Sequence, residues 1–81
     1  LLRVHPESYV KWLESISPQR DLIAIDDDTV MSPHSLRAAF LSAGSVPLAV
    51  DQVMSGKHQA VFCCVRPPGH HAESEKAMGF C

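Results

Sequence analysis

The sequence has no excess of basic residues, no long apolar run and no signal-peptide pattern. Seven Lys and Arg residues stand against nine Asp and Glu residues, which gives a net charge of −2. This balance provides no basic face for nucleic acid and no polybasic patch for an anionic membrane. No apolar stretch reaches the roughly 18–20 residues that span a bilayer. We therefore expect no direct nucleic-acid partner and no membrane association.

The number and spacing of the cysteines argue against a disulfide framework. The only three cysteines are Cys63, Cys64 and Cys81, an odd number with two of them adjacent. Neighbouring cysteines rarely pair with each other, and no Cys-x-x-Cys motif suggests a structural zinc site. Reduced thiols and a cytoplasmic location are the expectation.

The remaining composition is that of a globular protein. Hydrophobic residues make up 46% of the chain and charged residues 20%, which argues against intrinsic disorder. A length of 81 residues allows at most one small domain. A chain of this size buries only about 60–65% of the surface that its unfolded form exposes, so its stability would be marginal.

Two helices are predicted from apolar spacing. Residues 6–16 form one amphipathic helix, which ends where Pro18 disfavours helical backbone at the preceding residue. Residues 33–55 carry the second apolar stripe, which begins after the capping residue Ser32 and stops at Gly56. Pro47 interrupts this stripe, so one kinked helix and two helices split near residue 45 are both possible. The stripe stays in register, which favours the kinked helix.

Two short segments complete the pattern. Residues 21–28 read as a brief extended apolar segment followed by a solvated acidic loop. Residues 60–65 are continuously apolar, as in a parallel strand that is buried on both faces. This pattern predicts an α/β fold, but a single strand cannot form a sheet, because its backbone groups need neighbours. The sheet within this chain is therefore expected to be incomplete.

A polar loop follows that predicted strand. Pro67 and Pro68 restrict the backbone, and Gly69 then permits a turn that could direct His70 and His71 into one cavity. Two histidines in one site can divide proton acceptance and donation and would titrate as a coupled pair. Surface-loop histidines would look the same in sequence. Metal binding is a further alternative, although no third ligand stands at a recognisable spacing.

The segment Val65–Glu73, followed by Met78–Cys81, resembles the histone deacetylase family of the arginase/deacetylase superfamily. The match is nearest to class II members and to bacterial histone-deacetylase-like amidohydrolases. The stretch Asp27–Pro33 is also similar to the family. This resemblance implies a partial arginase/deacetylase fold, with residues 1–81 forming the N-terminal portion of a single catalytic domain.

The resemblance also implies roles for individual residues. His71 would be the general base that activates a zinc-bound water, with His70 assisting by electrostatics or as an acid. Phe80 would form one wall of the acyl-lysine tunnel, and the Gly79 carbonyl would accept the amide hydrogen of the substrate. Asp28 would lie on the rim, where it would hydrogen-bond the substrate backbone.

Some of these roles have alternatives. Asp26 and Asp27 compete with Asp28 for the rim position, and a solvated acidic loop is an equally good interpretation of all three. His5 and Tyr9 are expected to pack locally.

The family's Asp-x-His zinc motif is absent from these residues. We expect the full-length parent to bind zinc and to hydrolyse acetylated lysine or an acetylated polyamine. This chain alone is expected to bind no metal and to be inactive. The alternative is a non-enzymatic remnant that folds by self-association, as a homo-oligomer or strand-swapped dimer, through residues 60–65 or the apolar face of 33–55.

Overall fold

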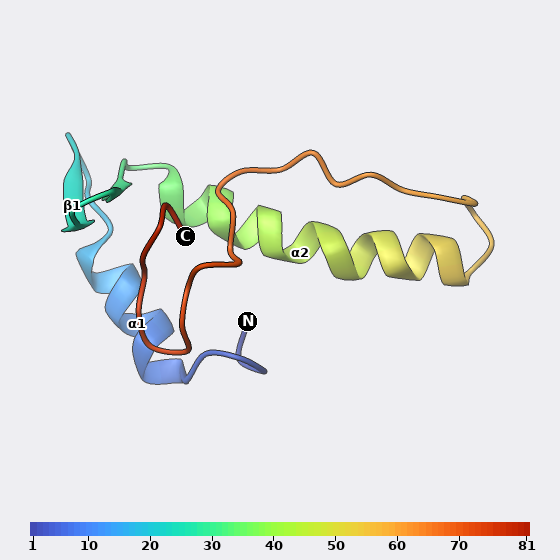
Figure 1. Ribbon diagram of the computed structural model, residues 1–81, viewed down its shortest axis with the longest axis horizontal. Coiled ribbons are helices and arrows are strands. Elements are labelled where there is room, and N and C mark those ends of the chain that lie inside the picture. Colours follow the sequence, from blue (N-terminus) through green and yellow to red (C-terminus); the bar gives the residue numbers. More distant parts are fainter.

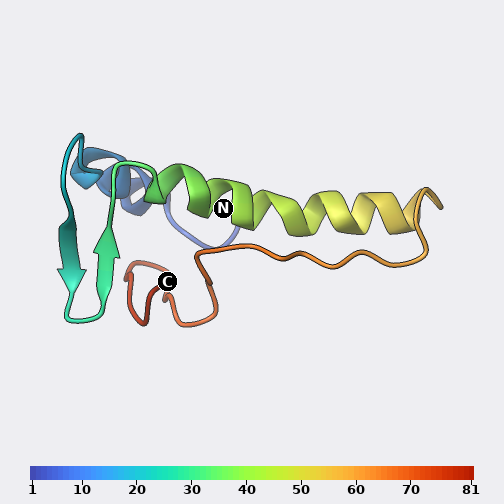
Figure 2. The same ribbon diagram turned by 90° about the horizontal axis from the view of Figure 1, so that it is seen from above.

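The computed structural model describes all of residues 1–81 and contains two helices and one β-hairpin (Figure 1). In chain order the elements are α1 (Glu7–Ile16), β1 (Ile23–Asp26), β2 (Thr29–Met31) and α2 (Ser35–Met54). The rest of the chain forms turns and loops, including a long segment that returns along α2 and a C-terminal loop (Figure 2). Neither helix is long and apolar enough to cross a membrane.

Helix α1 lies where the sequence predicts it. It begins directly after Pro6 and ends directly before Ser17. Tyr9 is buried on its inner face, while Glu7 and Lys11 form an ion pair of 2.7 Å on its exposed face. An exposed pair of this spacing contributes only about 0.3–0.5 kcal/mol, so the burial of Tyr9 is what fixes the helix against its neighbours.

The acidic segment forms the turn of a hairpin, because β1 and β2 pair in antiparallel fashion with an irregular register between residues 24 and 26. The backbone N–H of Asp28 donates to Asp26 Oδ1 over 3.1 Å, a local bond that aspartate commonly makes in turns. The extended segment within 21–28 is thus confirmed. Strand β2 was not predicted, because three residues are too few to show an alternating pattern.

Helix α2 is one continuous helix that passes through Pro47, so the interpretation with two separate helices is wrong. It begins at residue 35, two residues later than predicted. Ser32 still organises the entry, because its hydroxyl oxygen accepts a hydrogen bond of 3.3 Å from the His34 N–H.

The end of α2 follows from Gly56, as predicted. Gly56 has a φ of 77°, in the left-handed region where glycine has no Cβ penalty. Its N–H donates to the carbonyl of Val53, and the N–H of Lys57 donates to the carbonyl of Gln52. These two bonds are those of a Schellman motif, which satisfies carbonyls that the helix end would leave free.

Residues 60–65 do not form the predicted buried strand within this chain. They run back along α2 (Figures 1 and 2) and make no backbone–backbone hydrogen bond. Phe62 is 89% exposed. The physical reason is the one that made the sheet incomplete: the hairpin lies at the far end of α2, so no strand is available to pair with this segment.

The core is very small. The four buried residues are Tyr9, Thr29, Met31 and Ala77. The accessible surface of 6276 Å² exceeds the area of about 4,800 Å² expected for a folded chain of 8.9 kDa. The radius of gyration is 14.2 Å, against about 12 Å for a compact domain of this length. An additional surface of about 1,500 Å² is therefore left uncovered.

Candidate functional site

The C-terminal loop, residues 66–81, folds back between α1, the hairpin and the first half of α2 (Figures 1 and 2). At its entrance the Ser42 hydroxyl of α2 donates to the Pro67 carbonyl over 3.0 Å. Further along, His5 Nδ1 lies 2.8 Å from the Ser74 carbonyl oxygen and donates to it when that nitrogen carries the proton. Both bonds join distant parts of the chain, so the loop is held from two sides.

The two adjacent histidines lie in contact with each other. The ring centroids of His70 and His71 are 4.4 Å apart, with the ring planes at 81°. Both residues are exposed. The backbone N–H of His71 donates to Cys81 Sγ over 3.3 Å, which brings the last residue of the chain back to the histidine pair.

Gly79 packs directly on His71. Its φ is +58°, and a Cβ built on it would lie 2.9 Å from the Cβ of His71 and 3.0 Å from its Cγ. Real Cβ atoms do not approach each other so closely, and most other residues resist this backbone conformation. The loop can therefore place its backbone against the His71 side chain only because residue 79 is glycine.

Four of the five predicted site residues line one open cleft of about 390 Å³. Of the five, Asp28, His71, Gly79 and Phe80 line the cleft. His70 does not line it but contacts the ring of His71 from outside. Residues far apart in sequence are thus brought together.

The acidic turn lines the same cleft as His71. Asp26, Asp27 and Asp28 all line the cleft, so the geometry does not single out Asp28 among them. The backbone N–H of Asp28 lowers the pKa of Asp26 from its ordinary value, with a smaller contribution from the Asp28 side chain. The Asp28 carboxylate accepts a hydrogen bond of 3.3 Å from the Thr29 hydroxyl. The cleft is therefore lined both by carboxylates and by an imidazole.

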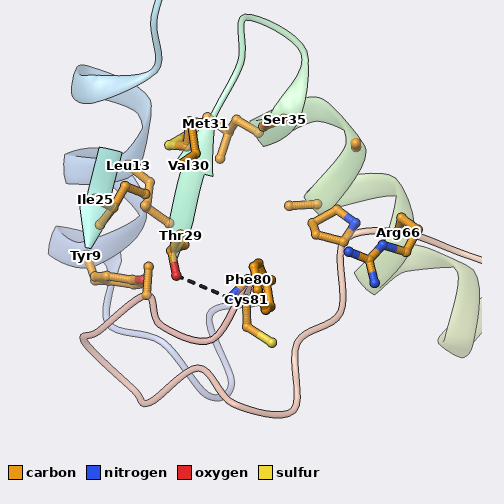
Figure 3. A pocket seen from close by; sticks show the side chains of 15 residues that line it. Tyr9, Leu13, Ile25, Thr29, Val30, Met31, Ser35, Arg66, Phe80 and Cys81 are labelled. Carbon is orange, nitrogen blue, oxygen red and sulfur yellow. Dashed lines mark hydrogen bonds between the residues drawn. The ribbon is translucent and has the colours of Figure 1, made fainter. Parts of the chain in front are cut away.

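A second, apolar cavity of about 360 Å³ lies between α1, the hairpin, the start of α2 and the loop (Figure 3). Tyr9, Leu13 and Met31 are among its lining residues, most of which are hydrophobic. Burial raises the pKa of Tyr9 at its edge. Phe80 borders both cavities. Because this cavity contains few polar groups, it resembles an incompletely covered core more than a reactive site.

No three His, Cys, Asp or Glu side chains gather closely enough to hold a metal ion. Catalytic zinc needs three protein ligands in addition to water or substrate, so the residues present do not fit a zinc ion.

Two residues of this region were not found from the sequence. Thr29 is 5% exposed and accepts a hydrogen bond of 3.2 Å from the Phe80 N–H, 51 residues away. His5 stacks near Tyr9 with ring centroids 5.3 Å apart, as the predicted local packing requires, but it also reaches Ser74. No periodicity or motif could have indicated either long-range bond.

Comparison with known proteins gives a consistent result. The histone deacetylase domain family matches residues 1–81. Histone deacetylase 18 of Arabidopsis thaliana is 43% identical over 84 residues, covering 96% of this chain and 12% of that protein. The histone deacetylase-like amidohydrolase of Pseudomonas aeruginosa is 38% identical over 81 residues, covering 100% of this chain and 21% of that protein.

A solved structure shows the same fold. The crystal structure of the HDA15 HD domain superimposes with a TM-score of 0.85 and 35% identity, covering 98% of this chain and 23% of that one. The predicted partial α/β fold is thereby confirmed, with the exception of the unpaired residues 60–65. The chain spans about an eighth to a fifth of the length of the two relatives described above. From the match over residues 1–81 and these identities, we conclude that the chain belongs to the histone deacetylase family.

Proposed function

We propose that residues 1–81 are the N-terminal portion of a single catalytic domain of a zinc-dependent deacetylase. The parent enzyme hydrolyses the N-acetyl amide of lysine or of a related amine, such as an acetylated polyamine. The observation that carries this proposal is the single cleft that combines His71, Gly79, Phe80 and the acidic turn. Such a cleft offers a proton acceptor, an apolar wall and acidic groups at one opening.

Each residue has a distinct role in this proposal. His71 accepts and returns the proton of the attacking water, and His70, in ring contact with it, modulates its charge. Phe80 packs flat against the methylene chain of the substrate. The Gly79 carbonyl accepts the substrate amide hydrogen, and Asp28 holds the substrate backbone at the rim.

The parent's zinc would be held by residues outside these 81, because no three ligating side chains gather here. When bound, such a metal polarises a carbonyl and lowers the pKa of water to about 7. The 81-residue chain therefore contains the proton-handling part of the site without the metal-binding part, and alone it is inactive. The proposed location is the cytoplasm, without direct contact to nucleic acid or membrane.

Self-association is a second candidate function for the chain in isolation. The unpaired backbone of residues 60–65 and the surplus surface of about 1,500 Å² favour it. That surplus exceeds the roughly 800 Å² which each partner buries in a standard interface. A dimeric mass by light scattering is the expected result, and a monomer with a cooperative thermal transition would contradict it.

The deacetylase proposal is tested with the complete polypeptide that carries these residues. We expect turnover of an acetyl-lysine peptide or an acetylated polyamine, lost on chelation and restored by zinc. His71→Ala should lower kcat by about 10²–10⁴-fold, the range for removal of a general base. His58→Ala, which removes an exposed imidazole beyond the end of α2, is the matched control and should change little. Turnover by the 81-residue chain alone, or full activity of His71→Ala, would contradict the proposal.

A further inference from the structure

Thr29 is the one buried polar residue of the chain, at 5% exposure. It begins β2 immediately after the acidic turn, and it lines the apolar cavity at the place where the C-terminal loop approaches the hairpin (Figure 3). Buried polar atoms are costly unless they are hydrogen-bonded. The two bonds of this hydroxyl therefore define its role.

The hydroxyl joins the two walls of the cleft. Thr29 Oγ1 donates to Asp28 Oδ1 over 3.3 Å and accepts from the Phe80 N–H over 3.2 Å, the bond drawn in Figure 3. A hydroxyl has one hydrogen and two lone pairs, so both bonds can be made at the same time. Donation to a carboxylate polarises the hydroxyl and strengthens it as an acceptor.

The Phe80 backbone needs such a bond. Its φ is 66°, in the left-handed region that bulky residues rarely adopt. Its N–H has no other partner, whereas Met78 and Cys81 bond each other's backbone on either side of it. The Thr29 hydroxyl is thus the contact that holds the Phe80 backbone to the hairpin.

We propose that Thr29 is a positioning residue that couples the acidic turn to Phe80 and so fixes the spacing between the rim and the apolar wall. This inference rests on the proposed deacetylase function for its catalytic consequence, but not for the coupling itself. A substrate that contacts both walls depends on this spacing. An acetylated amine too short to reach the rim does not.

The coupling is tested directly at the Phe80 amide in the complete polypeptide. Labelling with ¹³C-carbonyl glycine and ¹⁵N phenylalanine selects Gly-Phe peptides, of which Gly79-Phe80 is the one in these 81 residues. A second sample with ¹³C-carbonyl methionine and ¹⁵N glycine selects the Gly79 amide in the same way. We expect the Phe80 amide to exchange with solvent at least about tenfold more slowly than the Gly79 amide, which has no hydrogen-bond partner. Equal exchange rates in the unsubstituted protein would overturn the proposal, even if no variant folds.

Two substitutions separate the hydroxyl from the shape of the side chain. Thr29→Val keeps the shape and removes the hydroxyl, and should accelerate Phe80 exchange about tenfold. Thr29→Ser keeps the hydroxyl and should retain the protection. Ser55→Ala removes a hydroxyl bonded locally to the Gln52 carbonyl at the far end of α2 and serves as the control. Unchanged protection in Thr29→Val would overturn the coupling.

Kinetics then test the consequence for catalysis. Thr29→Val should raise KM for an acetyl-lysine peptide about tenfold, with kcat within about twofold, and should leave KM for a short acetylated amine unchanged. Thr29→Ser should restore the peptide KM. An equal fall in kcat for both substrates at unchanged KM would indicate mere loss of folded protein and would overturn the positioning role. If the unsubstituted protein turns over neither substrate, the deacetylase function fails, and the exchange experiment alone decides the coupling.

Discussion

The two ends of the molecule differ in how completely they are folded. The site end, defined as residues 1–39 and 66–81, contains all four buried residues. The arm, defined as residues 40–65, contains none, and it exposes much of its apolar surface, with Phe62 at 89% and Met54 at 81%. The site end is therefore shaped by contacts that this chain supplies, whereas the arm presents apolar surface that this chain does not cover.

Hydrogen bonds show the same contrast. In the site end, His5 bonds Ser74 and Thr29 bonds Phe80 across most of the sequence. In the arm, the backbone of residues 60–65 has no backbone partner at all. The difference teaches that the geometry of the candidate cleft depends on a few specific polar contacts. The stability of the folded chain depends instead on whether the exposed apolar surface of the arm is covered.

Replacement of the two most exposed phenylalanines, Phe62 and Phe80, should give the largest contrast. In the complete polypeptide, Phe62→Ala is expected to cost about 3–5 kcal/mol of unfolding free energy, because the rest of the domain would bury this ring. Phe80→Ala should cost less than about 1 kcal/mol, because that ring borders an open cleft, but should raise KM. Denaturant unfolding and steady-state kinetics measure the two effects. Equal stability losses would remove the distinction between arm and site end.

Replacement of one glycine in each region, Gly79 and Gly44, should give an intermediate effect. Gly79→Ala combines a left-handed backbone with a Cβ placed 2.9 Å from the His71 Cβ, and we expect a stability loss of about 1–2 kcal/mol. A displaced His71 should also lower kcat/KM by about 10²-fold. Gly44→Ala is the matched change in the arm. A Cβ built on Gly44 has no contact within 4 Å, and alanine in a helix should raise the free energy of unfolding by about 0.5–1 kcal/mol. Thermal unfolding of both variants checks the opposite signs.

Acid titration of the turn should give the smallest effect. The Asp28 N–H lowers the pKa of Asp26 below 3.8, so the folded state holds this proton less tightly than the unfolded state. The resulting stabilisation of the folded state is complete when the pH is above 3.8, the ordinary pKa of an aspartate, and it is lost as the pH falls through the lower pKa of the folded state. Carboxyl NMR should give a midpoint below 3.8. Asp28→Asn keeps the backbone N–H of residue 28 and should retain most of the lowering of the Asp26 pKa. A midpoint at or above 3.8 in the unsubstituted chain would contradict the lowered pKa of Asp26.

The sequence predicted the helices because their signals are local. Apolar spacing and Pro18 bound α1, and Gly56 marks the end of α2 through its own backbone freedom. The prediction of a buried strand at 60–65 identified the apolar run correctly, and the expected lack of neighbouring strands within this chain agrees with the unpaired backbone of that segment. Pairing is a property of at least two segments, so composition alone cannot establish it.

The candidate site was predictable only in part. Gly69, His70 and His71 are contiguous, so a single motif indicates them. Their juxtaposition with the acidic turn is a property of the fold, and the five site residues remain predictions as to their roles. The sequence did not indicate a role for Thr29, because a single threonine beside an aspartate is common. Its role becomes visible only through its hydrogen bond to Phe80, 51 residues away.

The proline pair between the arm and the histidines sets a boundary for any sheet built on this chain. Pro67 and Pro68 have no N–H, so strand pairing along residues 60–65 must stop there, after about 20 Å. If residues 60–65 paired with a neighbouring strand one residue out of register, their side chains would exchange faces, and Phe62 would turn away from the side chains it packs against. Such pairing could not extend the ladder to His70. The prolines thus keep any strand pairing of residues 60–65 from extending into the loop that contains His70 and His71.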